Sequence, residues 1–395
     1  WQNTLFDEVA FDAVTVRLPW SLIESAPGEY NGSYSAVLAA LGSQLPGSGI
    51  SINLSLDAID RKKLTLPDDL IEGLQSGSLR LSDPAIVGRF AALLEHVHAV
   101  IGDVPLVALT FGHEIDLMFS EQPDLQFWID FQVFYFIVSN HARSLWGPDL
   151  KVGLTATHDG LINPSTSWLM GYLNTTSNIV SMTYFPVGGD FEVVDPSEID
   201  ISGVIEAVSG TNGQKPIHIE ATGYPSGSVA KGSQMKQSQF LYKFFDSWDA
   251  HASQVPFVSF FRLHDADPAE VELRVESEGV NLDIAPAAAA YLGSLGLRSR
   301  AGNGQSKTGY SSLRNLVFER GWWREREYSD RPYLMGFTPE LFDFPPTQEE
   351  VMAVEAFLFE KMDADGDFIN VHMDSGIPWV EAAADTFESP VAPYS

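Results

Sequence analysis

The chain contains no cysteine and little positive charge. Without cysteine there can be no disulfide framework, zinc–thiolate site, iron–sulfur cluster or cysteine nucleophile. Its 23 Lys and Arg stand against 53 Asp and Glu, which gives a formal net charge of −30. Because phosphate binding needs a basic surface, this charge argues against a nucleic acid or an acidic membrane as partner. No uninterrupted apolar run is long enough to predict a membrane-spanning helix.

The length and the apolar content indicate a large folded protein. With 395 residues, of which 45% are hydrophobic, the chain can form one large barrel or two to three ordinary domains. We expect a secreted or periplasmic protein, although no signal peptide is visible and the chain begins at Trp1. The sequence leaves the oligomeric state open.

Short β-rich runs alternate with amphipathic helical stretches. Several of the runs are almost continuously apolar, as expected for parallel strands that are covered on both faces. A βα unit about every 35–45 residues, repeated in one series, predicts an α/β fold of the TIM (β/α)8-barrel type rather than an open sheet. No glycine-rich phosphate loop follows the first strands, which weakens a nucleotide-binding alternative. The predicted strands are residues 14–20, 50–56, 104–111, 152–157, 179–185, 217–223 and 257–263, and the clearest predicted helices are 83–101, 125–146 and 233–251.

The C-terminal part of the chain repeats the βαβ pattern. After residues 1–300, a polar stretch at 301–312 resembles a linker, and 313–395 then contains two further predicted strands, at 333–339 and 368–373, with a helix at 348–362 between them. This segment could complete the first barrel as a permuted first strand, begin a truncated second barrel, or reflect a residue order that differs from the native chain. We favour completion of the same barrel, because an isolated βαβ unit would leave its apolar faces in water. One misfit is that this count gives nine candidate strands.

Two glutamates are candidates for catalysis. Glu114 follows an apolar strand in VALTFGHEID, and Glu220 lies near the end of another in KPIHIEATGYPS. If the C-terminal segment supplies the first strand, these are strands four and seven, whose carboxyl ends face each other across the barrel mouth. Glycoside hydrolysis needs such a pair, one carboxylic acid to protonate the leaving oxygen and one carboxylate to attack or to activate water. We expect the acid to have a raised pKa.

These stretches resemble the retaining glycosidases of glycoside hydrolase clan A. That clan carries its acid/base glutamate after strand four, usually behind an asparagine, and its nucleophile after strand seven. Met182-Thr183-Tyr184-Phe185-Pro186 is similar to an element after strand six of several members, particularly the endo-β-1,4-galactanases, and Val16-Arg17-Leu18-Pro19-Trp20 is similar to the clan's second strand. The resemblance implies that Glu114 is the acid/base and Glu220 the nucleophile, and that Tyr184 and Arg17 position the nucleophile.

The chain departs from the clan pattern at two places. His113 stands where the asparagine is usual, and no tryptophan ends the eighth strand, which reads Phe260-Phe261-Arg262-Leu263-His264. The first departure affects the fine geometry of the site, and the second affects the platform under the reacting sugar.

The sequence thus predicts a retaining glycoside hydrolase for a β-linked glycan, with endo action preferred. It predicts no cofactor and no metal site, because carboxyl groups and water suffice for both steps. The alternative is a barrel that binds a carbohydrate without cleaving it, and a metal-dependent barrel hydrolase is a second rival. The predicted substrate-binding residues are Arg17, Trp20, His113, His158, Tyr184, Tyr224, His264 and Trp379.

Overall fold

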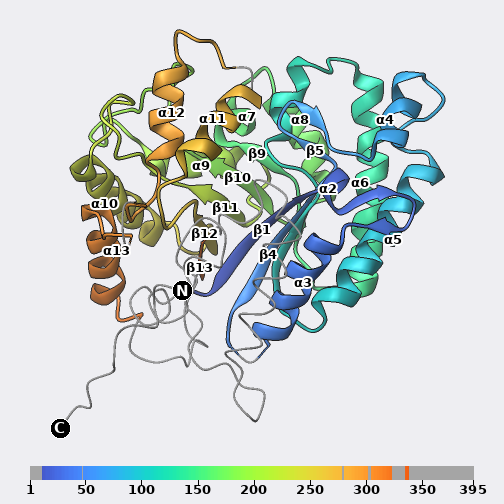
Figure 1. The fold of residues 1–395 in the computed structure, drawn as a ribbon, viewed down its shortest axis with the longest axis horizontal. Helices are drawn as coiled ribbons and strands as arrows, with labels where there is room; N and C mark the ends of the chain where they lie inside the picture. The colour runs from blue at the N-terminus through green and yellow to red at the C-terminus, as the bar shows by residue number, and fades with distance from the viewer. Residues whose placement is uncertain (1–10, 47, 278–279, 301–303, 323–333, 338–395) are drawn as a thin grey trace.

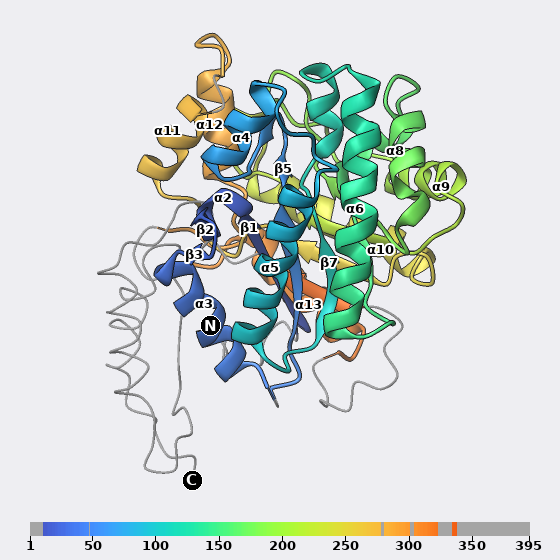
Figure 2. The same cartoon turned by 90° about the vertical axis from the view of Figure 1, so that its right-hand side faces the viewer.

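A computed structural model describes residues 11–46, 48–277, 280–300, 304–322 and 334–337. In these residues a sheet of parallel strands forms the centre and helices surround it (Figures 1 and 2). The nine strands follow the order β8-β7-β4-β1-β13-β12-β11-β10-β9. Their bounds are β1 Ala13–Pro19, β4 Ser51–Asp57, β7 Leu106–Thr110, β8 Val152–Gly153, β9 Thr155–Thr157, β10 Val180–Tyr184, β11 Ile217–Thr222, β12 Phe257–Phe260 and β13 Leu334–Phe337.

The sheet closes into a barrel of eight positions. Only Leu154 separates β8, which pairs with β7, from β9, which pairs with β10. These two short strands are therefore parts of one run that joins the two ends of the sheet. The predicted TIM-type α/β barrel is confirmed.

A strand from the C-terminal segment lies between the first and the last of the other strands. β13 pairs in parallel with β12 (Phe257↔Leu334) and with β1 (Ala13↔Gly336). Counted around the barrel from β13, β7 is fourth and β11 is seventh. The predicted helix at 348–362, the predicted strand at 368–373 and Trp379 lie outside the described residues.

Helices follow the strands, and side-chain caps fix several of their starts. Asn31, Asp124 and Ser233 each accept a hydrogen bond from a backbone N–H in the first turn, and Pro84 opens α5. The three clearest predicted helices correspond to α5, α6 and α10. The helices are α2 Trp20–Ile23, α3 Gly32–Gln44, α4 Asp68–Gln75, α5 Pro84–Ile101, α6 Leu125–Trp146, α7 His158–Ile162, α8 Ser167–Leu173, α9 Ile201–Thr211, α10 Gln234–Ala250, α11 Pro268–Ser277, α12 Ala285–Gly293 and α13 Thr308–Glu319, with the 3-10 helices η2 Ile115–Ser120 and η3 Asn174–Thr176 and the hairpins β2 Glu24–Ala26 with β3 Glu29–Tyr30 and β5 Ile59–Asp60 with β6 Lys63–Leu64.

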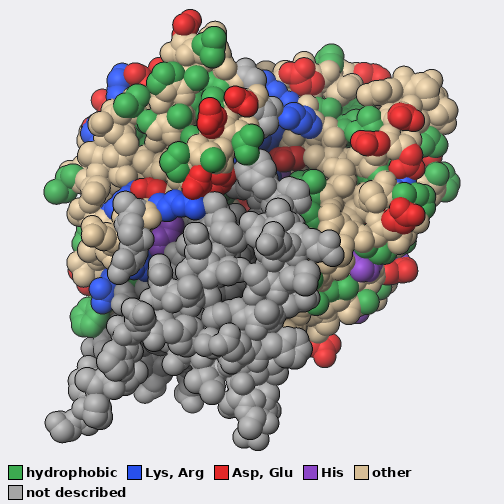
Figure 3. Space-filling model, viewed as in Figure 1, with side chains coloured by type: hydrophobic (Ala, Val, Ile, Leu, Met, Phe, Trp, Pro, Cys, Tyr) green, Lys and Arg blue, Asp and Glu red, His purple; other side chains and the backbone are tan. Residues whose placement is uncertain are grey.

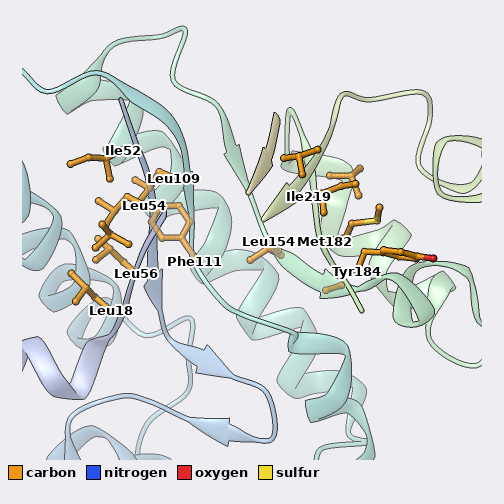
Figure 4. Close-up of a cluster of buried hydrophobic side chains, with 14 of the residues drawn as sticks. Leu18, Ile52, Leu54, Leu56, Leu109, Phe111, Leu154, Met182, Tyr184 and Ile219 are labelled. Atoms are coloured by element: carbon orange, nitrogen blue, oxygen red, sulfur yellow. The ribbon is translucent and has the colours of Figure 1, made fainter. Parts of the chain in front are cut away.

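The apolar core lies between the strands and the helices. Leu54, Leu109, Phe111, Met182 and Ile219 project from alternate strand positions into this layer (Figure 4). Such a core is expected when helices cover the outer face of a parallel barrel.

The inside of the barrel is polar instead. Thr15 on β1 donates to Ser259 on β12 at 3.0 Å, and Thr155 on β9 donates to Glu220 on β11. Each of these pairs joins strands that are not neighbours in the sheet, so the side chains meet in the interior. This differs from the Val, Ile and Leu layers that usually fill such barrels.

One helix resembles a membrane span in length and hydropathy, and one stretch that the sequence predicts as a linker contains the start of a helix. α5 has the length and hydropathy of a membrane span, but Phe90, Leu94 and Val97 on it are buried in the barrel core. α13 begins at Thr308, inside the stretch predicted as a linker. Lys307, the residue before α13, fixes the start of this helix. Its buried ammonium pairs with Asp265 and donates to the Gly296 carbonyl at 2.8 Å.

Charges of both signs are mixed on the face seen in Figure 3. Lys and Arg side chains stand there among Asp and Glu side chains.

Candidate active site

Glu114, His113 and Glu220 meet at the carboxyl-terminal side of the barrel strands. His113 and Glu114 are the third and fourth residues after β7, which ends at Thr110, and Glu220 belongs to β11. His113 Nδ1 lies 3.5 Å from Glu220 Oε1, and His113 Nε2 lies 4.0 Å from Glu114 Oε1. One imidazole ring therefore separates the two carboxylates that the sequence singled out.

Glu220 is held deep inside the barrel. Its Oε2 accepts hydrogen bonds from Thr155 and, at 3.2 Å, from Ser181, and its side chain is fully buried. Oε1 accepts no hydrogen bond. Burial acts to raise the pKa of Glu220, but contact with His113, the Arg17 charge and the Thr155 hydrogen bond outweigh it, so the pKa lies below the ordinary value.

Glu114 lies nearer to the surface, in the loop after β7 and immediately before η2. Its φ of 45° is left-handed, which is uncommon outside glycine and marks a position fixed by its surroundings. Thr183 donates to Oε1 at 2.7 Å, and Arg61 Nε lies 3.0 Å from Oε2. The side chain is 13% exposed.

The charge state of Glu114 differs from the sequence-based expectation. Burial acts to raise its pKa, but His113, Arg61 and the Thr183 hydrogen bond act more strongly in the opposite direction. The pKa of Glu114 is therefore lowered, whereas a general acid was expected to have a raised one. The cause is that the tertiary structure brings His113 and Arg61 to this carboxylate.

His113 lies between the two glutamates, and its pKa is raised. Burial and Arg17 act to lower the pKa of His113, while the two flanking glutamates raise it and prevail. Its backbone is fixed by the β5–β6 hairpin, because its N–H donates to the Ile59 carbonyl at 2.9 Å and its carbonyl accepts from the Arg61 N–H at 2.7 Å. The same hairpin thus positions His113 and Arg61, the two residues that lie beside the Glu114 carboxylate.

The strand β10 sets the spacing of the two carboxylates. Ser181 contacts Glu220, and Thr183 contacts Glu114. These two residues lie on the same face of one strand, two positions and so about 6.6 Å apart. The geometry therefore places the two carboxylates one side-chain repeat apart along the barrel axis.

Arg17 lies in the site but directly contacts aspartates rather than Glu220. Its Nη2 donates to Asp60 at 3.0 Å, and its Nε lies 3.7 Å from Asp57. Its charge lowers the pKa of Glu220 from a distance. The predicted support of the nucleophile is thus electrostatic in this structure.

Asp57 is the buried carboxyl that sequence reasoning missed. It is fully buried at the end of β4, and Ser55 donates to its Oδ1 at 2.6 Å. Burial raises its pKa to about 7, helped by Asp60 and opposed by Arg17, His113 and Ser55. The signal was present, because Asp57 ends an apolar strand as Glu114 does. Asp60, Arg61 and Thr183 carried no comparable signal.

The Tyr184 side chain lies on the opposite face of β10 from Thr183. Residues alternate along β10, so Thr183 points inward and Tyr184 outward. The Tyr184 ring lies 6.4 Å from the Phe244 ring of α10, and burial together with Asp200 raises the pKa of its phenol. Tyr184 therefore belongs to the layer between strands and helices and is not placed to orient Glu220.

Three further predicted binding residues are held in packing positions. The fully buried Trp20 indole donates to Glu24 at 2.7 Å, the Tyr224 hydroxyl donates to the Val194 carbonyl at 2.9 Å, and His264 is buried. The Trp20 indole and the Tyr224 hydroxyl are thus engaged within the protein, and the substrate contacts of all three residues stay predictions.

His158 remains beside the site. It begins α7, and its ring packs edge-on against Tyr184 with 4.9 Å between the centroids. Burial lowers the pKa of His158, partly offset by Asp159 and Glu114. Asp116 fixes this strand end, because it accepts from the Thr157 N–H at 2.8 Å and from the Thr157 hydroxyl at 2.6 Å.

The described residues contain no group of three or more His, Asp or Glu side chains arranged to hold a metal ion.

Comparison with known proteins shows similarity of fold. No family model and no curated protein sequence matches the chain. Among solved structures, the exo-β-1,4-mannosidase Op5Man5 from Opitutaceae bacterium strain TAV5 has a TM-score of 0.56 at 16% identity, over 80% of this chain and 54% of that one, so the chain spans about half of the mannosidase.

Two other solved structures are similar over more of their length. A GH5_18 variant from Streptomyces cattleya in complex with Manβ1-4GlcNAc has a TM-score of 0.58 at 15% identity, over 82% of this chain and 74% of that one. A β-glucosidase named 1317 has a TM-score of 0.55 at 14% identity, over 80% and 87%. The barrel of this chain is structurally similar to those of clan A glycosidases, among them mannosidases and β-glucosidases.

Proposed function

We propose that this protein is a retaining glycoside hydrolase for β-linked glycans, with Glu220 as nucleophile and Glu114 as acid/base. The observation that carries the proposal is the meeting of these two glutamates on either side of His113, from the fourth and seventh strands of the barrel. The fold similarity to glycosidases supports it. The endo-β-1,4-galactanase likeness of the sequence motifs stays a prediction.

The contacts of Glu220 distinguish its two oxygens. Oε2 is held by Thr155 and Ser181, while Oε1 accepts no hydrogen bond and faces His113. Oε1 is therefore the atom we assign to attack on the anomeric carbon. His113 lowers the pKa of this carboxylate, which favours the ionised form that a nucleophile requires.

In the first step the Glu220–carbon bond forms while the glycosidic bond breaks. Glu114 gives its proton to the departing oxygen, and a glycosyl-enzyme ester results. In the second step Glu114 takes a proton from water, whose oxygen attacks the anomeric carbon and releases Glu220. Because the pKa of Glu114 is lowered, we expect the activity to be highest at acidic pH.

A second candidate function is carbohydrate binding without cleavage. The observation that favours it is the pairing of Glu114 with Arg61 and His113, together with the complete burial of Glu220. Both features stabilise ionised, inaccessible carboxylates rather than a proton donor and an accessible nucleophile.

The experiment that tests the proposal is hydrolysis of aryl β-mannoside, β-glucoside and β-galactoside together with the corresponding polysaccharides. We expect Glu114→Gln and Glu220→Gln to lose at least about a hundredfold in kcat/KM. Glu72→Gln, on the exposed surface of α4, is the matched control and should keep full activity.

Two further measurements assign the roles. Azide should restore turnover of an aryl glycoside by Glu114→Ala, and a 2-fluoro glycoside should label Glu220 in the unaltered protein. NMR of the first product decides between retention and inversion. Binding of a glycan by the unaltered chain with no turnover on the whole panel would favour the second candidate.

A further inference from the structure

An exposed apolar surface lies on the outside of the barrel, away from the carboxylates. It consists of five residues on α6 and two on α8, and both helices lie on the side of the barrel that is turned toward the viewer in Figure 2. We call these residues the α6 face. Each is between 40% and 54% exposed, and they are Leu125, Ile129, Val133, Phe136, Ile137, Trp168 and Tyr172.

This surface is concentrated rather than scattered. Seven of the fourteen large apolar side chains that are exposed in the described residues belong to it. On α6 they recur at helical spacing along one stripe of about 18 Å. The other exposed positions of α6 are Gln126, Asn140 and Ser144, and the half-buried Arg143 stands at the C-terminal end of the stripe, so no carboxylate lies on this side of the helix.

The surface is also rigidly supported from behind. The opposite side of α6 buries Trp128, Phe131 and Phe134 in the core. Gln132 donates to Thr175 at 3.3 Å, which ties α6 to the η3 turn that follows α8. A partner would therefore meet a preformed surface and would lose little conformational entropy on ordering it.

The exposed area is close to what a stable interface needs. With about 200 Å² for a large side chain, the measured exposures leave roughly 600 Å² of apolar surface on the α6 face. A standard interface buries about 800 Å² per partner, with an apolar centre and a polar rim. Gln126, Asn140 and Ser144 provide such a rim.

The net charge of the chain restricts where two copies can associate. Two copies of a chain with a net charge of −30 repel each other, so they can associate only where no carboxylate must be buried. The α6 face meets this condition. We propose that it is the interface of a two-fold symmetric homodimer, in which α6 of one copy packs antiparallel to α6 of the other with Val133 near the axis.

This arrangement leaves the candidate active site free. α6 covers the outer side of the barrel, whereas Glu114 and Glu220 lie inside it at the carboxyl ends of the strands. Dimerisation and glycan turnover are therefore separable, and the proposal does not depend on the proposed function.

Sedimentation of the full chain between about 1 and about 100 µM tests the proposal. We expect a dimer whose dissociation constant rises at least about a hundredfold in Val133→Asp, because the axis would then bring two equal charges together. Met235→Asp, on an exposed position of α10, is the matched control and should dimerise like the unaltered chain. Circular dichroism shows whether both variants remain folded.

The absence of cysteine allows a second, independent test. In Val133→Cys the new thiol is the only one in the chain, and two such thiols near a two-fold axis can form a disulfide. Mild oxidation should give a covalent dimer of Val133→Cys and not of Met235→Cys. A chain that stays monomeric at about 100 µM would overturn the proposal, and so would equal crosslinking of both variants. A monomer that binds uncharged lipid vesicles through the α6 face would also overturn it.

Discussion

The buried carboxyl of Asp57 should make the stability of the protein depend on pH. Burial raises its pKa from the ordinary value of 3.8 to about 7. Between these two pH values the unfolded chain has lost the proton while the folded protein still holds it. The folded state is therefore disfavoured progressively as the pH rises from about 4 to about 7, and the loss is complete above pH 7.

The raised pKa of Asp57 sets the size of this effect. Each pH unit over which the two states differ by one proton changes the free energy of unfolding by about 1.4 kcal/mol. Between pH 5 and pH 8, about two pH units lie below the pKa of Asp57 in the folded protein. The ionisation of Asp57 should therefore lower the free energy of unfolding by about 3 kcal/mol over this range. Asp57→Asn cannot ionise and keeps an oxygen for the Ser55 hydroxyl.

The assay is urea denaturation of both proteins at pH 5 and at pH 8. The stability of Asp57→Asn relative to the unaltered chain should rise by about 3 kcal/mol between the two pH values. Comparing the difference at two pH values removes any constant packing cost of the substitution. Ser55→Ala removes a hydrogen bond that favours the charged form, so it should move the stability loss to higher pH. An Asp57→Asn difference that is the same at both pH values would refute this reasoning.

Three further substitutions test other parts of the structure. Arg61→Gln removes a cation that lowers the pKa of Glu114, so the alkaline limb of kcat/KM should move to higher pH; an unchanged profile would contradict the assigned role. Arg262→Leu leaves the buried Glu270 without its partner and should lower the free energy of unfolding by about 3–5 kcal/mol, most of which Glu270→Leu in the same chain should restore. Gly296→Ala places a Cβ 2.1 Å from the main chain after β12, so the melting temperature should fall, and an unaltered value would show that this loop can shift.

Much of the architecture could be predicted from local patterns. The runs of Val, Ile, Leu and Phe locate the barrel strands, and the 3.6-residue period locates α5, α6 and α10. Glu114 and Glu220 could be selected because a carboxylate near the end of an apolar strand in a parallel barrel faces its open end. The same rule would have selected Asp57.

The errors have one physical origin, which is that side-chain direction and charge environment are not local properties. Tyr184 and Thr183 are adjacent in the chain, yet the phase of the pleat sends one into the helical layer and the other to Glu114. Trp20 is an aromatic residue at a strand end, yet it is closed in by Phe90 of α5. Neither result can be derived from a motif.

The sequence by itself determined the alternation of strands and helices, the acidic charge and the chain positions of the two glutamates, because these depend on composition and short-range periodicity. Only the tertiary structure decided that β13 enters the barrel between β12 and β1, that His113 separates Glu114 from Glu220, and that Arg61 lowers the pKa of Glu114. These contacts join residues far apart in the chain, and electrostatic interactions depend on distance in space rather than on distance along the chain.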